Sequence, residues 1–307
     1  MPRSRSRRST AHGTALRGLL AAAGALLLTG CQSLAFAVAN TGVGPADASV
    51  VHDPLRGLAL DVYRPTLAKG ATAPVVVFLY GGGWKTGSRD QYRFVGQRLA
   101  ERGILAVVAD YRTYPAVTFP AFVEDGARAV AWARQHAPEY SGDPDRVFIA
   151  GHSAGAQIAA LIGTDPRYLA AHGLSASDLA GVIGLSGPYD FVISGGYRAV
   201  FGEPALWPQA QAINYVDGDE PPFLLIHGTA DRVVEARDSQ QLADKLRVNG
   251  VQARLLWLPG AGHVAPIAAI YAPTRNPDVL ESIVQFTTPA PSPQPSIVAA
   301  YSNDVLN

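Results

Sequence analysis

Apolar runs of strand length recur along this chain, and stretches with helical periodicity separate them. We predict strands for the apolar runs, at 58–63, 75–80, 104–109, 147–150, 182–185, 223–226 and 255–258. We predict helices for the stretches near 90–102, 120–136, 154–163, 236–249 and 278–286. Strands that alternate with helices indicate an α/β fold, in which helices flank both faces of a mainly parallel central sheet.

Other segments of the chain show neither pattern. Residues 31–48 are mostly small and are expected to form a tether, and residues 289–307 form a proline-rich tail. One domain, 49–288, lies between them and has the size of a single α/β domain. Inside it, the aromatic-rich stretch 187–218 predicts either a small cap-like insertion over a binding site or a loop that covers the sheet edge.

The segment that follows the apolar run at 147–150 is typical of a nucleophile elbow. It reads Gly151-His152-Ser153-Ala154-Gly155 and leads into a predicted helix. In the context of strand, sharp turn and helix, G-x-S-x-G presents a serine hydroxyl at the edge of the sheet. The two glycines permit the tight turn, and the start of the helix offers free N–H groups to a developing anion. We therefore predict that Ser153 is a nucleophile.

A glycine-rich loop follows the predicted strand at 75–80. Three glycines, 81–83, leave its backbone open to a substrate, and Trp84 comes directly after them. The N–H groups of this loop, together with that of Ala154, would form an oxyanion hole that meets the charge on a carbonyl oxygen. The loop matches neither the P-loop nor the dinucleotide-binding pattern, so we do not expect it to bind phosphate.

A serine nucleophile needs a base and an acid that orients the base. His263 lies in a glycine-rich loop after the run at 255–258, and Asp231 closely follows the run at 223–226. The order serine, aspartate, histidine is the order of the α/β-hydrolase triad. A structural role is expected for His227. The weaker alternatives are His152 and His227 for the base, and Asp190, Asp217, Asp219 and Glu235 for the acid.

These segments resemble carboxylesterase-type α/β-hydrolases, of the hormone-sensitive-lipase-like and the isoprenylcysteine-methylesterase-like or formamidase-like branches. The motifs that carry the resemblance are Tyr80-Gly81-Gly82-Gly83-Trp84-Lys85-Thr86-Gly87, Asp110-Tyr111-Arg112, Gly142-Asp143-Pro144-Asp145-Arg146, the serine motif, His227-Gly228-Thr229-Ala230-Asp231 and Gly262-His263. One departure is Tyr80, which stands where the family usually has histidine. The glycine backbone is intact, but the hydrogen bond that steadies the loop is changed.

The resemblance implies roles for individual residues. The implied catalytic triad is Ser153, Asp231 and His263, and the implied oxyanion donors are the N–H groups of Gly82, Gly83 and Ala154. In related hydrolases an insertion such as 187–218 often forms a cap. The expected pocket residues are Trp84, Tyr189 and Trp207. No cofactor is expected, and the sequence has no metal-ligand spacing of the H-E-x-x-H or C-x-x-C kind.

The first thirty residues are typical of a bacterial lipoprotein signal peptide. Five arginines precede an apolar segment, 19–28, which is too short to span a bilayer. Leu28-Thr29-Gly30-Cys31 resembles a lipobox, which implies cleavage before Cys31 and acylation of that residue. Cys31 is the only cysteine, so the chain has no internal disulfide. We expect a lipid-anchored protein of the cell envelope, with an ordinary cleaved signal peptide as the alternative.

Composition agrees with a globular domain. Hydrophobic residues make up 48% of the 307 residues, and 25 basic residues balance 25 acidic ones. Removal of the five arginines of the leader would leave 20 basic residues against 25 acidic ones. No basic face is predicted, so we expect no nucleic-acid partner.

Together these features predict a serine hydrolase that cleaves small carboxylic esters through an acyl-enzyme intermediate. Neutral imidazole is the base in this mechanism, so activity is expected to rise through about pH 6–8. An amidase, formamidase or peptidase on the same triad is one alternative. The other is a non-catalytic binding protein displayed on the envelope.

Overall fold

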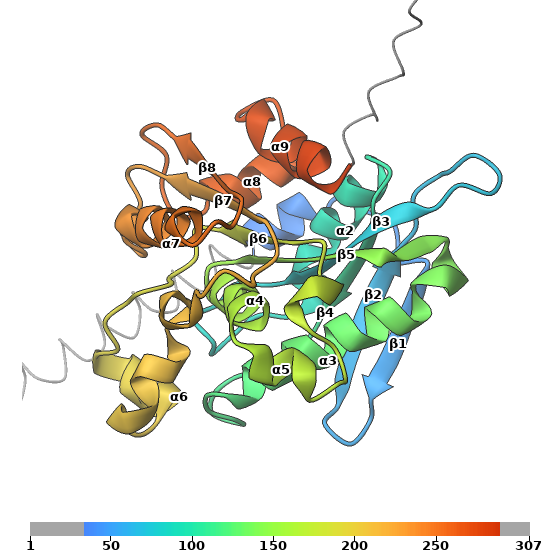
Figure 1. The fold of residues 1–307 in the computed structure, drawn as a ribbon. Helices are drawn as coiled ribbons and strands as arrows, with labels where there is room; N and C mark the ends of the chain where they lie inside the picture. Colours follow the sequence, from blue (N-terminus) through green and yellow to red (C-terminus); the bar gives the residue numbers. More distant parts are fainter. Residues whose placement is uncertain (1–33, 289–307) are drawn as a thin grey trace, which may run out of the picture.

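The structure is a computed structural model that describes residues 34–288 (Figure 1). The predicted signal peptide, 1–30, its acylation site Cys31 and the proline-rich tail, 289–307, lie outside the described residues. Within 34–288, none of the helices combines the length and the apolar character that crossing a membrane requires.

An eight-stranded sheet lies at the centre of the domain. Its strand order is β1-β2-β4-β3-β5-β6-β7-β8. β2 pairs antiparallel with both of its neighbours, and all the other neighbouring strands pair in parallel. The strands are β1 (Ala48–Asp53), β2 (Leu58–Tyr63), β3 (Ala73–Leu79), β4 (Leu105–Ala109), β5 (Gly142–His152), β6 (Gly181–Leu185), β7 (Phe223–Gly228) and β8 (Ala253–Leu258).

Helices cover both faces of this sheet (Figure 1). They are α2 (Arg93–Ala100), α3 (Ala121–His136), α4 (Ala154–Thr164), α5 (Pro166–Ala170), α7 (Ala236–Val248), α8 (Ala265–Tyr271) and α9 (Pro277–Thr287). On one face α8 packs between α2 and α9, and on the other α3 packs on α4 and α5. This is the predicted α/β architecture, and the fold class is confirmed.

The insertion 187–218 leaves the sheet between β6 and β7. It consists of short helical turns, η4 (Gly195–Tyr197), α6 (Arg198–Phe201), η5 (Pro204–Ala210) and η6 (Ala212–Tyr215). Turns this short do not sustain a repeating apolar pattern, which explains why the sequence showed none. Three further 3-10 turns connect elements elsewhere: η1 (Arg89–Tyr92), η2 (Ala137–Tyr140) and η3 (Ala176–Asp178).

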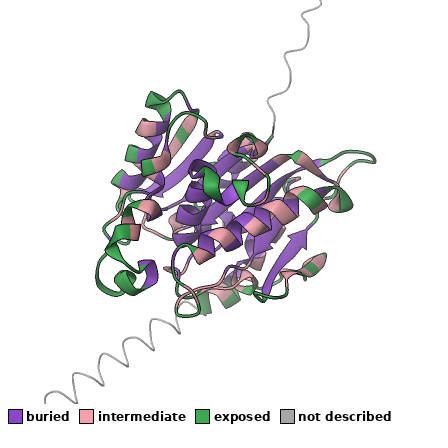
Figure 2. Cartoon of the chain, turned by 60° about the horizontal axis from the view of Figure 1, so that its bottom comes forward, coloured by how far each residue is buried: buried purple, intermediate pink, exposed green. Residues whose placement is uncertain are grey.

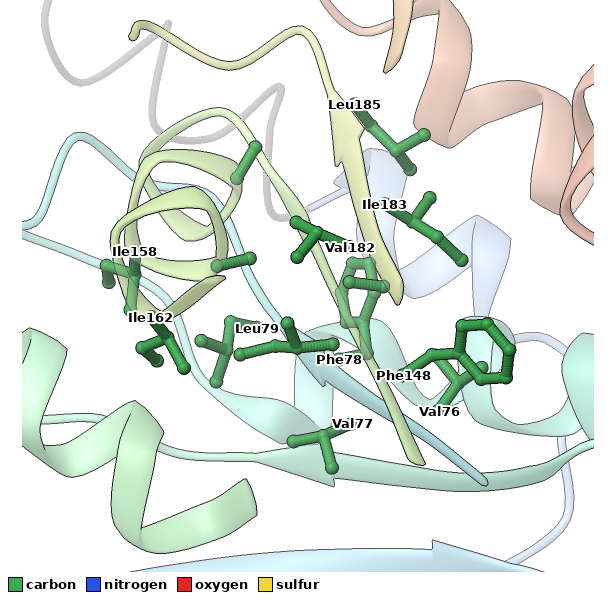
Figure 3. Close-up of a cluster of buried hydrophobic side chains, with 14 of the residues drawn as sticks. Val76, Val77, Phe78, Leu79, Phe148, Ile158, Ile162, Val182, Ile183 and Leu185 are labelled. Carbon is green, nitrogen blue, oxygen red and sulfur yellow. The ribbon is translucent and has the colours of Figure 1, made fainter. Parts of the chain in front are cut away.

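The hydrophobic core lies between the central strands and the helices on both faces. Every residue of β3 is buried, and so is every residue of α4. Figure 2 shows the centre of the sheet in purple, the colour of buried residues. Figure 3 shows Ile158 and Ile162 of α4 beside Leu79 of β3. A helix that is apolar on every side is stable only when it is surrounded by other elements. α4 therefore lies fixed inside the domain.

Some elements differ from the expectations. Strand β1 and the short helices α5 and α8 were not predicted. The part of the expected tether that the structure describes is docked: Phe36 packs on Tyr92 with ring centroids 4.9 Å apart. Asn40 donates to the carbonyl oxygen of Gln91 at 3.0 Å and accepts from the N–H of Phe94 at 3.0 Å. Most residues around Phe36 and Asn40 are small, so the sequence did not indicate that these two side chains attach the segment to the domain.

Two glycines allow β5 to turn directly into α4. A Cβ atom at Gly155 would lie 2.1 Å from the carbonyl oxygen of Leu79, and one at Gly151 would lie 2.2 Å from the backbone of Gly155. Both obstacles are backbone atoms, which cannot turn away as the end of a side chain can. The junction therefore depends on the absence of side chains at these positions.

We expect Gly155→Ala to destabilise the domain by about 1–3 kcal/mol or more, because β3 and α4 would have to separate. The matched control is Gly44→Ala, since a Cβ atom at Gly44 would meet nothing within 4 Å. The control should stay within about 0.5 kcal/mol of the parent. Urea unfolding of the three proteins measures the difference. Equal stability of the two variants would show that the junction tolerates a side chain.

Candidate active site

Ser153 sits at the turn between β5 and α4 with a strained backbone. Its φ is 54° and its ψ is −117°, a combination that costs a residue other than glycine about 1–3 kcal/mol. The Ser153 N–H donates to the carbonyl oxygen of Leu185 at 2.9 Å, and the Ser153 carbonyl accepts from Ala156 at 3.0 Å. These bonds to β6 and α4 hold the serine in place.

The structure brings Ser153, Asp231 and His263 together in one hydrogen-bonded line. His263 Nε2 lies 2.9 Å from Ser153 Oγ, and His263 Nδ1 lies 2.8 Å from Asp231 Oδ2. Nδ1 faces a carboxylate and therefore carries the hydrogen, so Nε2 presents its lone pair to the serine hydroxyl. The three residues follow β5, β7 and β8, whose carboxyl ends meet at one edge of the sheet.

Asp231 is held as an anion. Burial by itself raises the pKa of its carboxyl, but hydrogen bonds from Val234, His263 and Val233 outweigh burial and lower that pKa below its ordinary value. The N–H groups of Val233 and Val234 lie 2.8 Å and 3.0 Å from Oδ1. They leave Oδ2 free to face His263.

The glycine loop lies against the elbow and offers backbone donors. A Cβ atom at Gly81 would lie 3.2 Å from that of Ser153. Gly82 and Gly83 have φ values of 142° and 60°, which glycine adopts readily. Among the residues of the described range, no group accepts a hydrogen bond from the N–H of Gly82, Gly83 or Ala154. Ala154 starts α4, so its N–H has no partner within the helix.

Two tyrosines fix the start of this loop. Tyr80 Oη donates to the Tyr111 carbonyl oxygen at 3.1 Å, and Tyr111 Oη donates to the Tyr80 carbonyl oxygen at 2.8 Å. The two rings are stacked with centroids 4.4 Å apart. Burial raises the pKa of both hydroxyls, so both remain donors. The pair accounts for the unusual Tyr80. Tyr111 belongs to the Asp110-Tyr111-Arg112 motif, but its contact with Tyr80 was not predicted.

A buried amide connects the loop, the nucleophile helix and the insertion. Trp84 Nε1 donates to Gln157 Oε1 at 3.0 Å, and Gln157 Nε2 donates to the Ala210 carbonyl oxygen at 2.8 Å. Gln157 belongs to α4 and is fully buried. Trp84 also stacks on Phe191 of the insertion with ring centroids 5.5 Å apart. The role of Gln157 was missed because one glutamine in an apolar helix has no distinctive pattern.

A cavity of about 190 Å³ opens beside Ser153. Its lining includes Gly83, Trp84, Val233 and, from the insertion, Phe191 and Tyr197. The insertion therefore contributes directly to the wall of the serine cavity, as the cap-like alternative requires. Trp84, expected in the pocket, lines it.

Tyr189 and Trp207 do not line this cavity, which corrects the expectation for both. Tyr189 is fully buried, and its hydroxyl lies so close to Gly184 that a Cβ atom there would clash with it. Trp207 lines a separate groove of about 390 Å³ together with Pro204 and Pro208. Its Nε1 donates to the Gly202 carbonyl oxygen at 3.0 Å. Because the turns of the insertion are irregular, the sequence does not indicate which of its aromatic residues face Ser153.

The alternative base and acid candidates occupy other positions. His152 is buried, and its Nε2 donates to the His263 carbonyl oxygen at 3.2 Å. Burial lowers the pKa of His152 to about 3, so the ring is neutral. None of the alternative acids, Asp190, Asp217, Asp219 and Glu235, bonds to a histidine within the described residues. In the same range, no cluster of three or more metal-ligating side chains is present.

Comparisons with known proteins agree with this fold. The chain is 32% identical to the probable isoprenylcysteine alpha-carbonyl methylesterase ICMEL1 of Arabidopsis thaliana, over 70% of this chain and 50% of that protein. It is 34% identical to the esterase LipC of Mycobacterium tuberculosis, over 66% of this chain and 56% of that protein. The chain thus spans about half the length of these curated relatives.

A solved structure covers more of the fold. Esterase 2 of Thermogutta terrifontis, in its apo form, superposes with a TM-score of 0.67 at 27% sequence identity. The match covers 81% of this chain and 97% of that one. The fold and these matches place the chain among carboxylesterase-type α/β-hydrolases. It belongs to the BD-FAE family, whose model matches residues 60–246.

A buried carboxylate beside the cavity predicts a pH-dependent stability. Asp238 of α7 lines the cavity and accepts a hydrogen bond from the Tyr189 N–H at 3.3 Å. Burial raises the pKa of Asp238 to about 6, above its ordinary value of 3.8. The unfolded chain therefore releases this proton at lower pH than the folded chain does. Folding stability is lost as the pH rises from about 4 to above 6.

Asp238→Asn should remove this loss, because asparagine does not ionise and keeps an acceptor oxygen. We expect a gain in unfolding free energy on the order of 2 kcal/mol at pH 8, shrinking towards pH 4. Asp244→Asn, at an exposed position of the same helix, is the matched control and should show little pH-dependent difference. Urea unfolding across this pH range decides, and a gain that is equal at pH 4 and pH 8 would contradict the account.

Proposed function

We propose that this protein hydrolyses small carboxylic esters with Ser153 as the nucleophile, His263 as the base and Asp231 as the orienting acid. The observation that carries the proposal is the hydrogen-bonded line from Asp231 through His263 to Ser153, at 2.8 Å and 2.9 Å. The esterase relatives and the Thermogutta esterase support the same reaction class.

The proposed reaction begins when Ser153 Oγ attacks the ester carbonyl and His263 Nε2 takes its proton. Asp231 stabilises the imidazolium through His263 Nδ1. The N–H groups of Gly82, Gly83 and Ala154 stabilise the oxyanion. His263 then protonates the departing alcohol. Water, activated by His263 in turn, attacks the acyl group and releases the acid from Ser153.

We further propose that the preferred acyl groups are short. Support comes from the small cavity of about 190 Å³ beside Ser153, which side chains of the glycine loop and of the insertion bound. Trp84 limits it on the side of the glycine loop and is held by Gln157 and Phe191. Structures of the Thermogutta esterase with bound propionate and with bound butyrate support short acyl groups for that enzyme.

The first test is hydrolysis of p-nitrophenyl esters from acetate to palmitate by the mature domain. Acetate to butyrate should be the best substrates, and Ser153→Ala should lower kcat by about 10⁴-fold or more, because it removes the nucleophile. Activity should rise through about pH 6–8, because neutral imidazole is the base. A flat profile in that range would contradict the role of His263.

A fluorophosphonate probe separates the remaining alternatives. The Thermogutta esterase is seen phosphorylated by paraoxon, and we expect such a probe to label Ser153 of this protein. Labelling of the parent but not of Ser153→Ala would identify Ser153 as the nucleophile. If the parent then hydrolysed amides but not esters of the same acyl group, the amidase alternative would be favoured. The absence of both labelling and turnover would favour the non-catalytic binding protein.

We also propose that Cys31 is acylated and anchors the protein to the bacterial envelope. Support comes from the sequence Leu28-Thr29-Gly30-Cys31 after an apolar segment that is preceded by arginines. Expression with a clickable palmitate analogue should label the parent, and Cys31→Ser should lose the label and leave the membrane fraction. A protein that stays unlabelled but is shortened at its N-terminus would instead indicate an ordinary signal peptide.

A further inference from the structure

A second histidine bonds to the same carboxylate oxygen as His263. His227, at the end of β7, places Nε2 3.1 Å from Asp231 Oδ2, the atom that also faces His263 Nδ1. The side chains of His227 and Asp231 are fully buried. The other ring nitrogen, Nδ1, lies 2.7 Å from Oγ of Ser239, a buried residue of α7. Both nitrogens of His227 therefore have partners in a site without solvent access.

These partners fix the proton positions on His227. Nε2 faces only acceptors, Asp231 Oδ2 and the Val234 carbonyl oxygen at 3.4 Å, so Nε2 carries the hydrogen. Nδ1 then has a lone pair and accepts from the Ser239 hydroxyl. Burial lowers the pKa of His227, which keeps the ring neutral. His227 is therefore a neutral donor to the Asp231 carboxylate.

We propose that His227 is a positioning residue that sets how strongly Asp231 attracts a proton on His263. The inference rests on the proposed triad. An oxygen that accepts two N–H bonds has its negative charge partly compensated, so it stabilises an imidazolium less than an oxygen with one donor. His227 thereby weakens the attraction of Asp231 for the proton that His263 takes from Ser153. The second bond also prevents Asp231 from rotating away from His263.

Other titratable and charged groups lie near this assembly. They are His152 and, in the lining of the serine cavity, Asp190, Glu235, Arg237 and Asp238. The ring of His152 has its centroid 5.1 Å from that of His263, and burial keeps His152 neutral. Asp238, next to Ser239 on α7, lines the serine cavity and changes charge near pH 6. A rate profile alone would not separate Asp238 from His263. The experiment must therefore also follow the His263 ring itself.

The test compares His227→Leu, which removes the donor, with His227→Gln, whose amide nitrogen replaces Nε2. For His227→Leu we expect kcat on p-nitrophenyl acetate to fall about tenfold with little change in KM, because His263 is less well oriented. The acid limb of the rate profile should move up by about half a pH unit or more. His227→Gln should stay close to the parent in both respects.

A second readout needs no turnover. Histidine labelled with ¹³C lets NMR follow the titration midpoint of the His263 ring in the Ser153→Ala background, with and without His227→Leu. An upward shift in the variant supports the proposal. An unchanged titration midpoint of His263 together with a lower melting temperature would mean that His227 is merely structural, and this would overturn the proposal. The proposal would also be overturned if His227→Gln behaved like His227→Leu.

Two further controls keep the outcome clear. If His227→Leu does not fold, Ser239→Ala removes the hydroxyl that holds the His227 ring, and it should shift the midpoint in the same direction by a smaller amount. No shift in that variant would overturn the proposal. Ester hydrolysis by the parent that does not depend on Ser153 would refute the proposed function instead, whereas the NMR midpoint would still test the link between His227 and His263.

Discussion

The close approach of α4 to the end of β3 is the constraint on which the whole site depends. Gly155 comes so near the carbonyl oxygens of Leu79 and Tyr80 that no side chain fits between them. This contact places the serine turn and the glycine loop side by side through backbone alone. The strained Ser153 lies at this junction, where β5 turns directly into α4. Packing of the buried α4 supplies the energy that maintains the strain.

Buried polar side chains fix the glycine loop and the insertion, which the backbone contact between α4 and β3 does not hold. Tyr80 and Tyr111 each donate to the other's carbonyl oxygen, and Gln157 bridges Trp84 to Ala210 of the insertion. In a dry interior a lost partner leaves a polar group unsatisfied, at a cost of about 1–3 kcal/mol. Each of these bonds therefore favours a single loop conformation. The backbone N–H groups of the glycine loop are therefore held in a fixed position beside Ser153.

The fold and the three residues of the hydrogen-bonded line could be predicted from the sequence, because local patterns encode them. Buried strands give apolar runs, and the elbow needs glycine beside Ser153 for steric reasons. The insertion could not be predicted, since its short turns have no period, and so Tyr189 and Trp207 were misplaced. The bonds of Gln157 and His227 were also missed. They depend on which elements meet in space, and a single buried polar residue carries no sign of its partner.

If Cys31 is acylated as proposed, the docked segment before β1 limits how far the domain can move from that anchor. Phe36 is packed on Tyr92, and five peptide units separate it from Cys31. A fully extended chain covers about 3.5 Å per residue, so the reach is roughly 18 Å, less than the thickness of a bilayer core. An acylated Cys31 would thus confine the enzyme to a thin layer at the lipid surface. Substrates that partition into that layer would meet it at a local concentration far above that in the surrounding solution.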